Sequence, residues 1–209
     1  MGAIAMAGML SLIVAGSAVV APAPIEANTW FTSRESPKTA LAVAQRGHIA
    51  YRIVVSPDGT ALRCEPAGQT DLDNKVCELV MKRARFLPAK DDMGRPVFGV
   101  HDGVASFLMP GKNSGRPDRA KLAFAVDRLP EGVTSPAYAR VAFMVDSAGA
   151  ISNCASAMPE RRGRMQIVEA LGPSACEHLA KGYRPVPARD ASGQPVASIQ
   201  SAMVRFETR

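Results

Sequence analysis

Four cysteines carry the clearest chemistry in this chain. They form two pairs, Cys64 with Cys77 and Cys154 with Cys176. Paired thiols form disulfides or bind metals, but a structural zinc site needs four ligands and commonly uses a C-x-x-C spacing that this chain lacks. His178 follows Cys176 by two residues, whereas the first pair has no histidine at that position. We therefore expect one disulfide within each pair and no metal.

The other residues that could do catalysis are not arranged for it. His48, His101 and His178 do not occupy equivalent positions, and a hydrolytic triad needs a Ser or Cys near a His and an acid. His101 and Asp102 could form a dyad, but a turn or bulge in a long strand explains them more simply. The chain has no glycine-rich phosphate loop. We expect no enzyme activity and no cofactor.

Disulfides persist in oxidising compartments, and the N-terminus predicts export to one. Residues 3–21 are apolar and small, which is typical of a secretory signal peptide, with cleavage after Ala27 or Ala18. We assign residues 1–27 to this leader. The stretch is also about long enough to span a bilayer, so an uncleaved inner-membrane anchor is the alternative.

A repeated arrangement organises the rest of the chain. Residues 88–97 read PAKDDMGRPV, and residues 187–196 read PARDASGQPV. The offset between the copies is 90 residues at the first cysteine of each pair and 99 at the second, so the second copy holds nine extra residues between its cysteines, in the region around 158–164. This self-similarity indicates two copies of one small fold. Asp91 and its equivalent Asp190 are expected to accept backbone hydrogen bonds in a turn.

Each copy shows the pattern of a β-hairpin, a helix and a final strand. The elements expected in the first copy are strands over 51–55 and 60–64, a helix from the N-cap Thr70 to about Arg85, and a strand over 95–109 with a bulge at Gly99 or Gly103. The elements expected in the second copy are strands over 138–145 and 150–154, a helix over 174–181, and a strand over 194–206.

The expected domains follow from these elements. The first repeat covers 28–109 and begins with a short helix near Ser36, and the second covers 118–209. A linker rich in Gly and Pro, 110–117, joins them. The formal net charge is +6 and only 5% of residues are aromatic. Because few aromatic residues accompany the basic runs, and because the protein is exported, we expect no nucleic-acid partner.

These motifs resemble the TonB C-terminal-domain family, in a cysteine-bearing form. The segments that carry the resemblance are Ser36-Pro37-x-x-Ala40, the hairpin Tyr51–Gly59, and Arg83-Ala-Arg-Phe86 running into Pro88–Val97. The second copy has Gly182-Tyr183-Arg184-Pro185 where Ala-Arg-Phe would stand, and the resemblance covers about residues 30–209. It implies an α+β fold of two tandem domains, each a helix packed on a small antiparallel sheet and stapled by one disulfide.

The resemblance also implies how the protein binds. In energy transducers of this family the domain crosses the periplasm and pairs an edge strand with a short segment of an outer-membrane receptor, which is β-augmentation. The candidate surfaces are the final strands, 97–107 and 196–206. The residues expected to form the partner-binding edge of the last strand are Val196, Ile199, Met203, Val204 and Phe206. The alternative is that either strand is buried between the two domains.

Such transducers carry an N-terminal anchor with polar residues that couple to a proton-driven partner complex, followed by a long Pro-rich spacer. In the printed sequence Ser11 and Ser17 are the only polar groups in residues 3–21, and no long Pro-rich spacer follows. We therefore expect an exported periplasmic interaction module that serves TonB-linked outer-membrane transport by strand pairing. Its expected partner is a protein, either a TonB-dependent receptor or another envelope protein, and a homodimer is a further alternative. The alternative function is that of a membrane-anchored energy transducer.

Overall fold

The computed structural model of this chain describes residues 18–31, 48–107, 118–157 and 167–209. Four of the expected features lie outside the described residues, namely the short helix near Ser36, the linker 110–117, the insertion around 158–164 and most of the leader. Within the described part, no helix is both long enough and apolar enough to cross a membrane.

The hairpin, helix and final strand expected in each copy are present. The elements up to the end of the first repeat are β1 (Ala23–Ile25), η1 (Ala27–Thr29), β2 (His48–Val55), β3 (Ala61–Pro66), α2 (Asp71–Arg83), β4 (Arg85–Leu87), β5 (Ala89–Lys90), β6 (Pro96–Val97) and β7 (Gly99–Ser106). Those of the second repeat are β8 (Ala120–Val126), β9 (Ala137–Val145), β10 (Ile151–Ser156), η3 (Glu169–Leu171), α3 (Gly172–Gly182), β11 (Ala188–Arg189), β12 (Pro195–Val196) and β13 (Ser198–Thr208).

Helix α2 begins where the sequence predicts. The Thr70 hydroxyl accepts a hydrogen bond from the Asp73 N–H at 3.3 Å, and the Asp73 carboxylate accepts one from the Thr70 N–H at 2.9 Å. This capping box satisfies two backbone donors that a helix start leaves unpaired. Val76 and Val80 are fully buried against the hairpin, so their helical spacing sets the face that packs.

Both expected disulfides are confirmed. Cys64 is bonded to Cys77 with a Cα–Cα distance of 5.4 Å, and Cys154 is bonded to Cys176 with a Cα–Cα distance of 5.7 Å. Each bond joins the second strand of a hairpin to the helix that follows. In the entropic account, a loop of this size restricts the unfolded chain by about 3 kcal/mol.

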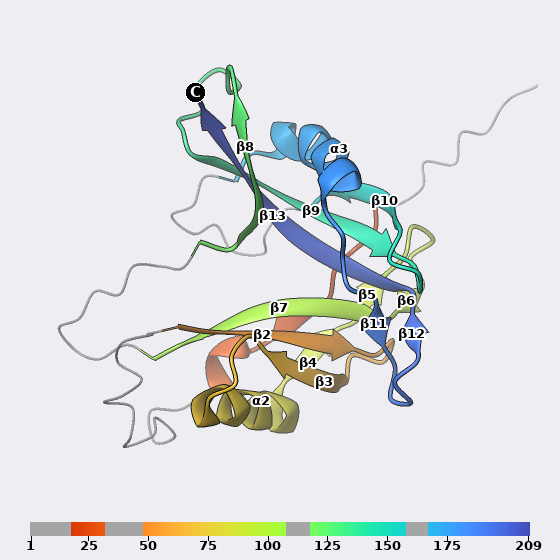
Figure 1. Cartoon of the computed structure of the whole chain (residues 1–209). Helices are drawn as coiled ribbons and strands as arrows, with labels where there is room; N and C mark the ends of the chain where they lie inside the picture. Colours follow the sequence, from red (N-terminus) through yellow and green to blue (C-terminus); the bar gives the residue numbers. More distant parts are fainter. Residues whose placement is uncertain (1–17, 32–47, 108–117, 158–166) are drawn as a thin grey trace, which may run out of the picture.

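The mixed α and β composition is confirmed, but the two expected sheets are joined into one. The strand order is β10-β9-β13-β7-β2-β3, with β8 also paired to β13 (Figure 1). The join is a parallel contact between β13 and β7 at Ile199 and Gly99. Each repeat therefore contributes its final strand to the middle of a shared seven-stranded sheet.

The two helices lie on opposite faces of this sheet, as Figure 1 shows. On β2, Ile53 and Val55 pack under α2, and the intervening Val54 points to the other face. On β13, Val204 and Phe206 pack under α3, on the face that Val54 shares. Because side chains alternate along a strand, Val54 and Val100 of the first repeat and Ile199 of the second point to the face away from the helix of their own repeat.

Each repeat covers that face of the other with a short hairpin. Ala188 and Val196, from β11 and β12, pack on Val54 and Val100 of the first repeat. The equivalent residues of the first repeat do the same on the second: Ala89 and Val97, from β5 and β6, pack with Ala142, Met144 and Ile199. The exchange of hairpins buries apolar surface that a separate domain would expose.

The bulge expected at Gly99 or Gly103 is wrong. Strand β7 pairs with β2 in unbroken register from His48 opposite Ser106 to Val55 opposite Gly99. Gly103 is instead required by packing, because a Cβ atom there would clash with the ring of Tyr51. The break in the expected long strand falls at Phe98, between β6 and β7.

Candidate functional site

The last strand is not a free edge, which corrects the expectation for its binding residues. Strand β13 pairs with β9 along one side, and from Met203 to Thr208 it pairs with β8 along the other. Ile199, Val204 and Phe206 are fully buried, Val196 lies in β12, and Met203 pairs with Ala120 of β8. The alternative, burial between the two repeats, holds only at Ile199, which pairs with Gly99 of β7. From Met203 onward the same side of β13 is covered by β8, which belongs to the second repeat itself.

A cleft opens where β7 and β13 separate. The two strands pair at one position only, after which β13 continues along β8 and β7 diverges (Figure 1). The cleft has a volume of about 1110 Å³. Its walls include 101–104 of β7, 118–121 at the start of β8, 201–203 of β13, and residues 18–24 and 26–28 at the N-terminal end of the described chain. The rest of the lining comes from His48 and 50–52 of β2, 65–67 at the end of β3, and Arg140, Ser156 and Ala157 of the second repeat.

The inner side of β7 presents backbone groups to this cleft. The Ile199 N–H donates to the Phe98 carbonyl at 2.9 Å, so Phe98 points toward β13. Backbone groups alternate in direction along a strand, so Val100, Asp102 and Val104 point the same way, and Gly103 points to β2. Within the described ranges no strand pairs with this side of β7 beyond Gly99.

The second repeat shows how such an edge is filled. The offset of 99 makes Val104 the counterpart of Met203, which is where β8 begins its parallel pairing with β13. Leu122 and Phe124 of β8 pack on the core of the second repeat, and alternate residues of the strand are exposed. An extended segment with alternating apolar residues therefore fits this type of edge.

In the first repeat, Phe31 takes the place that Phe124 of β8 has in the second repeat, but among the described residues no strand pairs with β7 there. Phe31 packs on Phe107 with ring centroids 6.1 Å apart, and Phe124 packs on the equivalent Phe206 with centroids 6.3 Å apart. The apolar floor beside β7 is thus partly built, and its backbone edge is open among the described residues.

Two edges of the sheet, those of β10 and β3, are protected against pairing. Strand β10 carries a register shift, and its Asn153 has a left-handed backbone with φ of 48°. Strand β3 also follows a register shift and ends in Pro66, which has no N–H. Bulges and proline are devices that block edge-to-edge association. The inner edge of β7 has neither.

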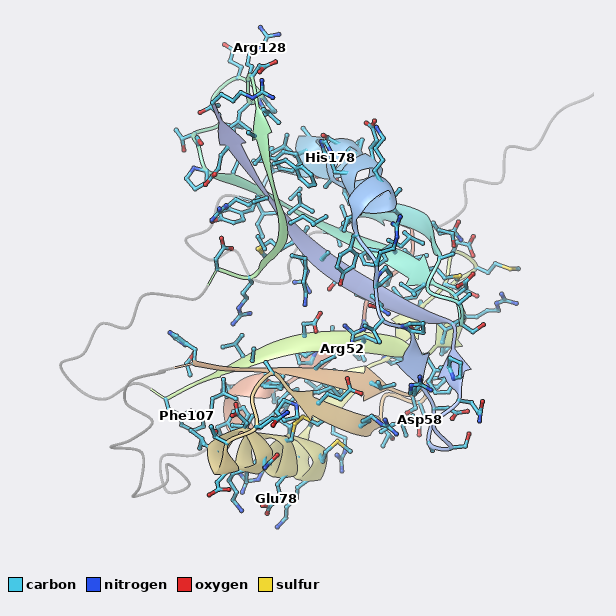
Figure 2. All side chains as sticks on the ribbon, in the orientation of Figure 1. Arg52, Asp58, Glu78, Phe107, Arg128 and His178 are labelled. Carbon is cyan, nitrogen blue, oxygen red and sulfur yellow. A yellow bond between two sulfur atoms is a disulfide. The ribbon has the colours of Figure 1, made fainter. Side chains whose placement is uncertain are left out.

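Charged side chains tie the two walls of the cleft together. Arg52 donates from Nη2 to the Gln200 side-chain oxygen at 2.9 Å and to the Val186 carbonyl at 3.0 Å, and Figure 2 shows it between the two halves of the sheet. Asp102 lies 3.9 Å from Arg52 and 3.5 Å from Lys121 of β8. Gln200 is 2% exposed, so its bond with Arg52 is partly shielded from water, whereas the side chains of Asp102 and Lys121 are 32% and 35% exposed.

The titratable groups at the cleft do not form a catalytic pair. His101 and Asp102 are neighbours in a regular strand, so their side chains point to opposite faces and make no dyad. Burial, with Arg140 and Arg119 adding to it and Asp102 opposing, lowers the pKa of His101 to about 4. Burial raises the pKa of Tyr51 to about 12. Both side chains are neutral at pH 7.

The equivalent acids Asp91 and Asp190 are turn residues, as expected. Asp91 accepts from the Met93 and Arg95 N–H groups at 3.0 and 2.9 Å, and Asp190 accepts from those of Ser192 and Gln194 at 2.9 and 3.0 Å. Within the ranges that the structure describes, no cluster of three or more His, Cys, Asp or Glu side chains is placed to hold a metal ion.

Sequence reasoning missed the cleft itself. Its residues come from parts of the chain up to 185 residues apart, from Ala18 to Met203, and no motif marks the point where two strands diverge. Comparisons with protein-family models, curated proteins and solved structures found no match to this chain.

Proposed function

We propose that this chain is an exported envelope protein that captures an extended segment of another envelope protein by strand pairing. The observation that supports it best is the inner edge of β7, which is free of bulges and proline and faces a cleft large enough for a peptide segment. The partner segment forms a strand parallel to β7, as β8 does on β13, with apolar residues at alternate positions.

Two disulfides support the proposed location. Such bonds persist in the periplasm and are rare in the cytosol. A TonB-dependent outer-membrane receptor is the proposed partner, following the resemblance of the motifs to the TonB C-terminal-domain family. One segment binds per chain, because β8 already covers the equivalent edge of the second repeat.

In-cell photocrosslinking tests the proposal. A photoreactive phenylalanine analogue at Ser106, an exposed residue at the open end of β7, is expected to give adducts with a single envelope protein. The same probe at Glu78, on the outer face of α2 (Figure 2), is the matched control and is expected to give none.

A proline substitution separates strand pairing from other contacts. Val104→Pro removes an N–H that points into the cleft, and it leaves the β2 ladder intact because Gly103 and Ala105 make those bonds. The variant is expected to lose the Ser106 adducts, and Val104→Thr to keep them. Adducts that persist in Val104→Pro would mean that the partner does not pair with β7.

The alternative, a membrane-anchored energy transducer, depends on residues 3–21 acting as an inner-membrane span. Fractionation distinguishes the two functions. Release of the protein with other periplasmic proteins on osmotic shock supports the exported binder, and retention in the inner membrane supports the transducer.

A further inference from the structure

We propose that the leader is removed after Ala18, so that the exported chain begins at Val19. The sequence offers two sites with a small residue before the cut, Ala18 and Ala27. Cutting after Ala27 would remove residues that the folded protein uses, and cutting after Ala18 removes, of the described residues, only the exposed Ala18. This inference rests on export, which belongs to the proposed function, and is independent of strand pairing.

Val19 is a core residue. It is 4% exposed and packs with Ala89, Ala142 and Ile199, in the cluster that joins the hairpin of the first repeat to the sheet of the second. Ala18, immediately before it, is exposed. The boundary between solvent and core therefore falls at the Ala18–Val19 bond.

The next residues are bonded to the first repeat through their backbone. Val20 and Lys90 exchange two N–H···O bonds of 2.9 Å. Strand β1 then pairs antiparallel with β4, with Ala23 opposite Leu87 and Ile25 opposite Arg85. The Trp30 indole N–H donates to the Ile25 carbonyl at 3.1 Å, and Trp30 is 2% exposed.

Strand β7 is shaped to accept this segment. Pro22 is buried against Gly99, where an added Cβ would lie 2.8 Å from the proline ring. Real Cβ atoms essentially never come this close to another heavy atom. A glycine at the junction of β6 and β7 thus makes room for a residue that cutting after Ala27 would discard.

The chemistry of the site agrees with the packing. A cut after Ala18 has Gly16 and Ala18 as the small residues that a signal peptidase reads, and a cut after Ala27 has the branched Ile25 at the corresponding upstream position. Pro22 and Pro24 disfavour cuts immediately before them. Because the fold uses residues 19–21, the apolar stretch left for the leader is 3–18, which is short for a membrane span of about 20 residues.

The position of the cut also decides the shape of the cleft. Residues 18–28 form one of its walls, so a chain that began at Asn28 would lose nearly all of that wall. Processing after Ala18 removes only Ala18 from this wall.

Intact mass and N-terminal sequencing of the protein recovered from the periplasm of a bacterial host test the site, using the full chain. Wild type and Ala27→Tyr are expected to begin at Val19, and Ala18→Tyr is expected to accumulate with the leader attached. Ala18 and Ala27 are both exposed, so neither tyrosine disturbs the core.

A wild-type chain that begins at Asn28, or that keeps residues 1–18, would overturn the inference. So would unchanged processing of Ala18→Tyr. None of these results depends on the crosslinks from Ser106, so failure of the cleavage site and failure of strand pairing are distinguishable.

Discussion

Val100 and Ile199 occupy equivalent positions in the two repeats, and each is covered by the hairpin of the opposite repeat. Val100 packs with Ala188, and Ile199 packs with Ala89. The repeats are therefore related by an approximate two-fold axis that runs along the strands, which puts their helices on opposite faces of one sheet (Figure 1). Neither repeat completes its core without the other.

This exchange predicts a single unfolding transition. Ile199→Ala is expected to destabilise the whole protein by about 2–5 kcal/mol, because Ile199 is fully buried. The chain has one tryptophan, Trp30, which is buried in the first repeat. In urea titrations the midpoint from Trp30 fluorescence should fall together with that from far-UV circular dichroism, although the substitution is in the second repeat.

The control for this prediction is Val186→Ala, since Val186 is 62% exposed and should change stability by about 0.5 kcal/mol or less. A Trp30 midpoint that stays at the wild-type value in Ile199→Ala would show that the repeats unfold independently.

Arg52 is expected to couple the two walls of the cleft. Arg52→Met leaves the buried Gln200 oxygen without its donor and should cost about 1–3 kcal/mol. A double-mutant cycle with Gln200→Leu should show a coupling energy of about 1 kcal/mol or more. Arg63→Met, at a surface pair with Glu65 at 4.0 Å, should change stability by about 0.5 kcal/mol or less. Strictly additive effects of the Arg52 and Gln200 substitutions would contradict the coupling.

Gly99→Ala should destabilise the protein by about 1–3 kcal/mol. The added methyl group would lie 2.8 Å from the Ala89 side chain and from the Pro22 ring, so both must shift. Gly182→Ala at the end of α3 meets nothing within 4 Å and should be neutral or stabilising by up to about 1 kcal/mol. Thermal melts of the two variants check this, and equal melting temperatures would count against close packing at Gly99.

Stability should depend on pH through His101. Burial, with Arg140 and Arg119 adding to it, lowers the pKa of His101 to about 4 in the folded protein, against about 6.5 in the unfolded chain. Between these values the unfolded chain binds the extra proton, so His101's contribution to the free energy of unfolding is lost as the pH falls from about 6.5 to 4. The loss is at most about 3 kcal/mol.

His101→Gln is the variant that tests this. Glutamine occupies the equivalent position, Gln200, in the second repeat. Urea titrations from pH 7.5 to 4 should give a smaller loss of stability in the variant than in wild type. An identical pH profile in both proteins would exclude His101 as the source.

The local elements could be predicted because their signals lie within short stretches. Thr70 and Asp73 mark a helix start through hydrogen bonds three residues apart, and Asp91 marks a turn through bonds to residues two and four positions on. The cysteine pairing followed because each pair lies in one copy of the repeat. Alternating apolar residues predicted the final strand of each repeat, but alternation does not say which neighbour a strand pairs with.

By itself, the sequence predicted the repeated motifs, the order of hairpin, helix and final strand in each copy, and the two disulfides. The tertiary structure alone decided that the final strands meet in the middle of one sheet, that β8 covers the edge expected to bind, and that β7 is left open. The reason is physical. Val54, Val100 and Ile199 are apolar residues on the face opposite the helix of their own repeat, and the hairpin of the other repeat buries them. Such contacts join residues about 90 positions or more apart, and no local pattern in the chain encodes them.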